Sequence, residues 1–111
     1  MGECFEIEGT AESQANLSDG TTTFTNSVFA CENGENFKNA DGDVDLENWF
    51  TTVQADNAVE ATQAAALTGI YSNTVGTPKD FSGDTFFENA DFIGAVKADA
   101  DWTAGWTVGL E

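Results

Sequence analysis

Histidine and arginine are absent from this chain of 111 residues, which holds three lysines against twenty aspartates and glutamates. Without histidine, the Ser–His and Cys–His pairs that activate nucleophiles are not available. Without arginine there is no guanidinium to clamp a phosphate or carboxylate. The glycines are scattered, and no glycine-rich phosphate-binding loop occurs. These absences argue against most enzyme classes, and we expect a protein that is not an enzyme.

Paired carboxylates are the catalytic arrangement that this composition leaves open, because glycosidases use two of them. Glu88 and Asp91 are the pair that lies near aromatic residues in the sequence. With twenty carboxylates in the chain, such a pair arises by chance. We therefore keep the non-catalytic interpretation.

The formal net charge of −17 excludes two classes of partner. Nucleic acids and anionic lipids both need lysine and arginine to neutralise their phosphates. No run approaches the roughly 18 apolar residues that a membrane span requires. We expect no nucleic-acid partner and no membrane insertion. The charge fits a solvated acidic surface, or one adapted to salt or loaded with calcium.

Two cysteines, Cys4 and Cys31, belong to no C-x-x-C motif, and a zinc site without histidine would need further carboxylate ligands. We expect a disulfide between them; the alternative is two buried free thiols. A disulfide places the protein in an oxidising compartment, outside the cell or on its surface. The opening Met1-Gly2-Glu3 has no apolar segment of a signal peptide. We therefore expect the chain to be a fragment whose export signal lies upstream.

Hydrophobic residues make up 41% of the chain and include nine phenylalanines and three tryptophans, enough for one folded domain over residues 1–111. Residues 4–31 read as β-structure, with Phe5 and Ile7 on one face of a first strand and further strands at 21–25 and 27–31. Residues 84–111 read as C-terminal strands at 86–87, 92–96 and 106–110.

Residues 43–69 have a helical pattern instead. Leu46, Trp49, Phe50 and Val53 follow the spacing of one helix face, and Asp43 and Asp45 stand where they can cap its first turn. A second helix is expected from the signal that starts at Asn57 and runs through 61–67 to Gly69.

The tail Phe86-Phe87-Glu-Asn-Ala-Asp-Phe-Ile-Gly-Ala95, followed by Asp101-Trp-Thr-Ala-Gly-Trp-Thr107, resembles the C-terminal signature of large secreted and cell-surface proteins of marine and related bacteria. Residues 4–7 and 28–31 are similar to the last coils of that family. The resemblance implies a mostly β fold, the terminal coils of a right-handed parallel β-helix with one or two short helices. A small antiparallel β-sandwich is the alternative.

The resemblance also implies a role. The chain would be the C-terminal end and cap of a secreted bacterial surface β-helix protein, a structural or interaction module. Each coil of a solenoid needs neighbours to bury its face. An uncovered first coil would expose backbone N–H and C=O groups and invite end-to-end self-association.

Two possible ligand sites follow from the residues themselves. Asn39, Asp41, Asp43, Asp45 and Glu47 alternate through an oxygen-rich run that suits Ca²⁺. Counted from Asn39, the EF-hand positions six and twelve hold Val44 and Phe50, so the EF-hand pattern fails. A calcium loop of another kind and a solvated acidic loop that caps a helix both remain open. We expect no cofactor other than calcium at this run.

The second possible site is aromatic. Trp49, Trp102 and Trp106, with Tyr71, could form a stacking platform for a surface glycan. The pattern places Trp49 on the helix face and Trp106 on an alternating strand, which are core positions. A small carbohydrate- or calcium-binding module is therefore the alternative to the structural or interaction module.

Overall fold

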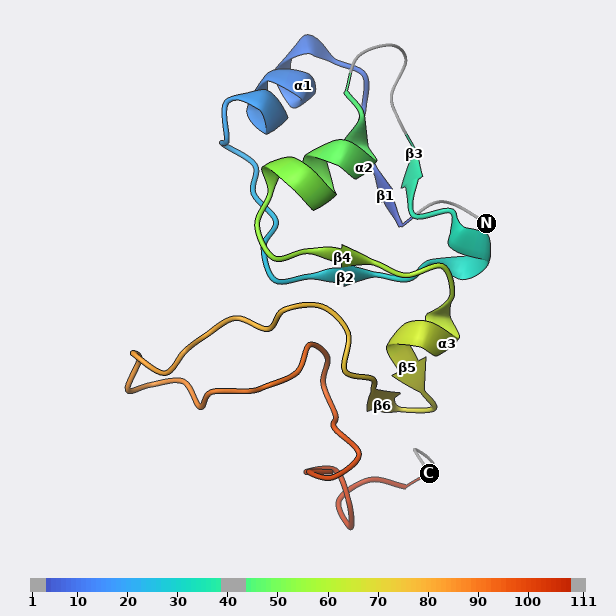
Figure 1. Ribbon diagram of the computed structural model, residues 1–111, viewed down its shortest axis with the longest axis vertical. Coiled ribbons are helices and arrows are strands. Elements are labelled where there is room, and N and C mark those ends of the chain that lie inside the picture. The colour runs from blue at the N-terminus through green and yellow to red at the C-terminus, as the bar shows by residue number, and fades with distance from the viewer. Residues whose placement is uncertain (1–3, 39–43, 109–111) are drawn as a thin grey trace.

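The computed structural model describes residues 4–38 and 44–108 (Figure 1). The strands of these residues are two residues long each. They are β1 (Phe5–Glu6), β2 (Val28–Phe29), β3 (Phe37–Lys38), β4 (Ala58–Val59), β5 (Leu67–Thr68) and β6 (Tyr71–Ser72). The helices are α1 (Ala11–Ser18), the 3₁₀ turn η1 (Glu32–Gly34), α2 (Leu46–Asn48), the π-helical turn η2 (Trp49–Val53) and α3 (Gln63–Ala66).

The strands form three separate pairs. In the parallel pair of β1 and β3, Phe5 lies opposite Phe37. In the parallel pair of β2 and β4, Val28 lies opposite Ala58. The third pair, β5 and β6, is antiparallel. Both parallel pairs join residues about thirty positions apart. The chain therefore forms two equivalent units that lie side by side: the first is β1–α1–β2 and the second is β3–α2–η2–β4.

The equivalence of the two units extends to an unusual backbone conformation. Asn26 and Asp56 both have positive φ, 52° and 61°, and each stands two residues before its strand. Asparagine and aspartate tolerate this left-handed region better than other side chains. The sequence carries a matching signal, because Gly-Glu-x-Phe occurs at 2–5 and again at 34–37.

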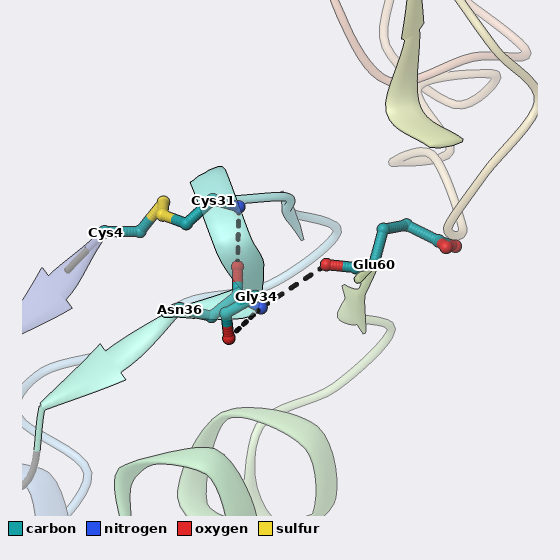
Figure 2. The surroundings of a disulfide bond; sticks show 5 residues. All are labelled: Cys4, Cys31, Gly34, Asn36 and Glu60. Atoms are coloured by element: carbon teal, nitrogen blue, oxygen red, sulfur yellow. Dashed lines mark hydrogen bonds between the residues drawn. A yellow bond between two sulfur atoms is a disulfide. The ribbon is translucent and has the colours of Figure 1, made fainter. Parts of the chain in front are cut away.

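Two asparagine side chains extend the short β2–β4 ladder at its ends. At the start, Asn57 Oδ1 accepts the Ser27 N–H at 3.0 Å while its Nδ2 donates to the Phe24 carbonyl at 2.9 Å. At the far end, Asn36 Oδ1 accepts the Cys31 N–H at 2.8 Å and its Nδ2 donates to the Glu60 carbonyl at 3.3 Å (Figure 2). Side chains thus satisfy backbone groups that a longer ladder would pair.

The hydrophobic core lies between α1, α2, η2 and the parallel pairs. Leu17, Leu46, Trp49 and Phe50 are buried there. The Phe29 and Phe50 rings stack, with centroids 4.3 Å apart and an interplanar angle of 6°. The remaining rings packed against this centre are Phe5, Phe24 and Phe37. The expected Cys4–Cys31 disulfide is present and ties the residue before β1 to the end of β2 (Figure 2).

The expected helix around Trp49 is confirmed, with one difference. Asp45 caps it by accepting the Asn48 N–H at 3.0 Å, and Leu46, Trp49 and Phe50 face the core. Val53 is instead 62% exposed. The Gln54 N–H donates to the Trp49 carbonyl, so the last turn is π-helical. A π-turn holds more residues than an α-turn, which moves Val53 off the buried face.

Two other helix expectations differ from the structure. The second helix is only α3, and its N-cap is Thr62 rather than Asn57, because Asn57 serves the β2–β4 ladder. Helix α1 falls where β-structure was expected. Its N-cap is Thr10, whose hydroxyl oxygen accepts the Ser13 N–H at 3.2 Å.

The C-terminal segment crosses below the β2–β4 pair with little regular structure (Figure 1). The described residues after Ser72 form no strand beyond an isolated bridge between Lys97 and Ala100. The radius of gyration is 16.3 Å, against about 13 Å for a compact domain of this length. None of the helices in the described residues is long and apolar enough to cross a membrane.

The mostly β fold, with terminal coils of a right-handed parallel β-helix, is therefore wrong. The described strands are too short and lie in three separate pairs, one of them antiparallel. They do not form the two packed sheets of the alternative antiparallel sandwich either. The strands expected at 21–25, 86–87 and 92–96 are not formed. Strands need a partner at the right register, and the residues of the tail find none. End-to-end self-association stays a prediction, but the described residues do not form the stacked coils from which it was argued.

Candidate functional site

The three tryptophans considered for a ligand site do not come together. Trp49 is 4% exposed, and its Nε1 donates to the Leu17 carbonyl at 3.0 Å. Trp102 and Trp106 are 67% and 88% exposed in the C-terminal segment. The core position expected for Trp49 is confirmed. The core position expected for Trp106 is wrong, because the strand that would have turned it inward is not formed.

Trp102 is exposed but held in place. Its Nε1 donates to the Ala95 carbonyl at 2.8 Å, which fixes the edge of the indole to the backbone. Trp106 lies one turn later, where its N–H donates to the Thr103 carbonyl at 3.0 Å. We call residues 95–107 the tryptophan turn. It presents two large aromatic side chains to solvent.

A second exposed aromatic group lies earlier in the same segment, in the loop that Figure 1 shows apart from the tryptophan turn. Phe86 and Phe87 are both exposed, and their ring centroids are 5.0 Å apart. Phe81 packs against Phe87 at 5.1 Å. The Phe-Phe doublet was read as a strand. Because neighbouring strand residues point to opposite faces, the doublet itself indicated that one ring would be left outside a core.

An ion-pair group joins the start of the tryptophan turn to Asp91, which precedes it. Lys97 Nζ contacts both oxygens of Asp91 at 3.0 Å and Asp99 Oδ1 at 3.6 Å. The hydrogen bond from Lys97 lowers the pKa of Asp91, and the same bond raises the pKa of Lys97. Asp91, considered with Glu88 for glycoside hydrolysis, is thus held ionised. A general acid needs the opposite shift.

Asp101 anchors the tryptophan turn to β6. Its Oδ1 accepts the Thr103 N–H at 2.8 Å and its Oδ2 accepts the Tyr71 hydroxyl at 3.2 Å. The hydrogen bonds from Thr103, with a smaller contribution from Tyr71, lower the pKa of the Asp101 carboxyl. The bond from the Tyr71 hydroxyl joins the turn to β6, and Thr103 beside it is buried.

The acidic run is described in part. Asp41 and Asp43 lie outside the described residues. Asp45 caps α2, and Glu47 is exposed. Across residues 4–38 and 44–108, no group of three or more histidine, cysteine, aspartate or glutamate side chains is arranged to hold a metal ion. Calcium binding by Asp41, Asp43, Asp45 and Glu47 stays a prediction.

The hollow below β2 has a different character from the tryptophan turn. It has a volume of about 360 Å³ and separates β2 and α3 from the C-terminal segment. Its wall is made of aliphatic side chains and of Gln63 and Gly94; the aliphatic ones are Val28, Ala30, Ala66, Leu67, Val75 and Ile93. It lacks the convergent polar groups of a catalytic site.

Comparisons of this chain with protein-family models, with curated proteins and with solved structures find no match. The resemblance of the tail to secreted bacterial proteins therefore stays a prediction.

Proposed function

We propose that the protein is a non-catalytic interaction module that works outside the cell or on its surface. The observation that carries this proposal is the contrast between the two parts of the chain. The aromatic rings from Phe5 to Phe50 pack together around the buried Trp49 and Phe50, and a disulfide ties this part of the chain together. Residues 80–108 leave Phe86, Phe87, Trp102 and Trp106 exposed. They form two exposed aromatic groups, the phenylalanine pair and the tryptophan turn, and exposed apolar groups of this kind are typical of interaction sites.

The electrostatics support a role without catalysis. The resolved carboxyl pKa shifts among the described residues are all downward, at Asp19, Asp80, Asp91 and Asp101. Each has a hydrogen-bonded neighbour that favours the ionised form. General acids are tuned the other way, by burial that raises the pKa. These carboxylates serve turns and solubility.

The surface area is also consistent with a partner. The accessible surface is 7600 Å², against about 5,900 Å² for a compact monomer of 11.8 kDa by the usual scaling. The excess, roughly 1,700 Å², follows from the extended shape of the chain, which leaves surface open that a compact domain would bury. The disulfide suits an oxidising, extracellular setting.

Carbohydrate binding is the second candidate, favoured by Trp102. The hydrogen bond to Ala95 orients the indole while leaving it mostly exposed. Flat, oriented aromatic faces suit stacking against sugar rings. Trp49 has no part in this candidate because it is buried.

The test compares two double variants, each of which replaces two exposed apolar side chains with serine. W102S/W106S removes the exposed indoles. V53S/L67S, the matched control, removes exposed apolar side chains elsewhere. Both are run with the wild type over immobilised neutral polysaccharides and over basic and acidic polypeptides. We expect one class of column to retain the wild type and the control but to release W102S/W106S. Equal behaviour of all three proteins on every column would contradict an interaction site at the exposed tryptophans.

A further inference from the structure

We infer that the tryptophan turn recognises a basic partner, a protein segment that presents lysine or arginine side chains. This inference rests on the proposed function and names the partner for its site. It combines two properties of the turn. One is the pair of exposed indoles, and the other is the excess of carboxylates in the same segment of the chain.

The exposed aromatics share their segment of the chain with an excess of negative charge. Residues 80–108 contain six carboxylates and one lysine. That lysine, Lys97, is held between Asp91 and Asp99 at 3.0 Å and 3.6 Å, so the three side chains together keep a net negative charge. Asp101 stands directly before Trp102 and is held ionised by Thr103. A cation that approaches the indoles therefore meets carboxylates on the same turn.

Indole faces complement the carboxylates, since tryptophan is the best of the aromatic side chains for contact with an ammonium or guanidinium group. The Trp102 edge is occupied by its bond to Ala95, which leaves the rest of the indole for a partner. Fixing the ring in advance also removes the cost of ordering it on binding.

The net charge discriminates between occupants. A second copy of the chain would bring another −17 to the contact, and like charges across an interface are unfavourable. A neutral glycan would stack on the indoles and donate hydroxyl hydrogen bonds to the carboxylates, but it would gain no charge attraction from them. A basic segment uses both, and opposite charge also speeds its encounter with the protein. Charge complementarity therefore selects the basic segment.

The experiment measures binding of a ten-residue lysine peptide to the full chain by calorimetry, at 0.15 M salt. W102L/W106L keeps the net charge and most of the apolar area but removes the aromatic faces. We expect this variant to bind about five- to thirtyfold more weakly, from two cation–π contacts at exposed sites. D99N together with E88Q should also weaken binding. E12Q/E47Q, the matched control, removes two exposed carboxylates on α1 and α2 and should bind as the wild type does within about twofold, because the screening length of ~8 Å isolates them.

Two results overturn the inference. If W102L/W106L binds the peptide as tightly as the wild type does, attraction is general and the indoles have no part in it. If a neutral polysaccharide binds in a Trp102- and Trp106-dependent way while the lysine peptide does not, the partner is a glycan. The interaction module then stands while the basic partner is excluded. Loss of tryptophan-dependent binding to every probe contradicts both proposals.

Discussion

Replacement of Asn36 by alanine should destabilise the fold by more than its size suggests. Asn36 is 5% exposed and bridges the two strands at the end of the β2–β4 pair (Figure 2). Its side chain accepts the Cys31 N–H at 2.8 Å and donates to the Glu60 carbonyl at 3.3 Å. Alanine leaves both backbone groups without this partner.

The magnitude follows from their burial. A buried polar group left unsatisfied costs about 1–3 kcal/mol. Cys31 is buried, so its N–H meets the full cost, whereas Glu60 is half-buried and water replaces part of the lost bond. We expect a loss of about 2–3 kcal/mol in the free energy of unfolding. That is a large share of the 5–15 kcal/mol typical of a small domain.

An aspartate at the same position sharpens the test. Asn36→Asp keeps an acceptor for Cys31 but places a carboxylate oxygen against the Glu60 carbonyl. At pH 7 it should be at least as destabilising as alanine, and part of the loss should return at low pH, when the protonated acid can donate. Asn16→Ala, on the exposed face of α1, is the control and should change stability by less than about 0.5 kcal/mol.

Urea unfolding followed by circular dichroism measures all of these variants. The reasoning is refuted if Asn36→Ala and Asn16→Ala have the same midpoint, or if Asn36→Asp is the milder change at pH 7. In the first case the bridge would contribute nothing beyond an ordinary surface asparagine, and in the second the hydrogen bond to the Glu60 carbonyl would contribute nothing.

Three further predictions concern the disulfide, the C-terminal segment and its anchor. Reduction of the Cys4–Cys31 bond, whose ends are 27 residues apart, should lower the free energy of unfolding by about 3.5 kcal/mol through loop-closure entropy. The urea midpoint should be lower with reductant than without it. An unchanged midpoint would refute this prediction. Gly94→Ala should lower the free energy of unfolding by about 1–3 kcal/mol, because φ is +126° and a Cβ would overlap Ser72 Oγ. Amide hydrogen exchange should then be faster around residues 70–76. Exchange at the wild-type rate there would contradict the overlap. The pKa of the Asp101 carboxyl is lowered in the folded chain. The ionised carboxyl therefore stabilises the fold at any pH above the ordinary unfolded pKa near 3.9, and this stabilisation is lost as the pH falls through the folded pKa. The carboxyl carbon shift measures the pKa by NMR, and a pKa at or above about 3.9 would refute the prediction.

Around Trp49, neighbouring residues alone supply the signal, and there the sequence predicted the helix correctly. Asp45 caps the helix that begins at Leu46, and Trp49 and Phe50 lie on its buried face, because spacing within one or two turns sets both features. The two cysteines are joined. The N-cap at Thr10 is a local signal of the same kind, and it marks the start of α1.

Tertiary structure alone decided the pairing and the exposed site. Whether 86–87, 92–96 and 106–110 become strands depends on a partner at the right register, and no local pattern supplies one. Without that partner, the alternation around Trp106 buries nothing, and the ring stands in solvent. Asn36 and Asn57 look like ordinary turn residues in sequence. Their role appears only when segments about thirty residues apart are brought together. Each side chain bonds backbone groups of distant segments, and the sequence around the asparagine does not show which segments these are.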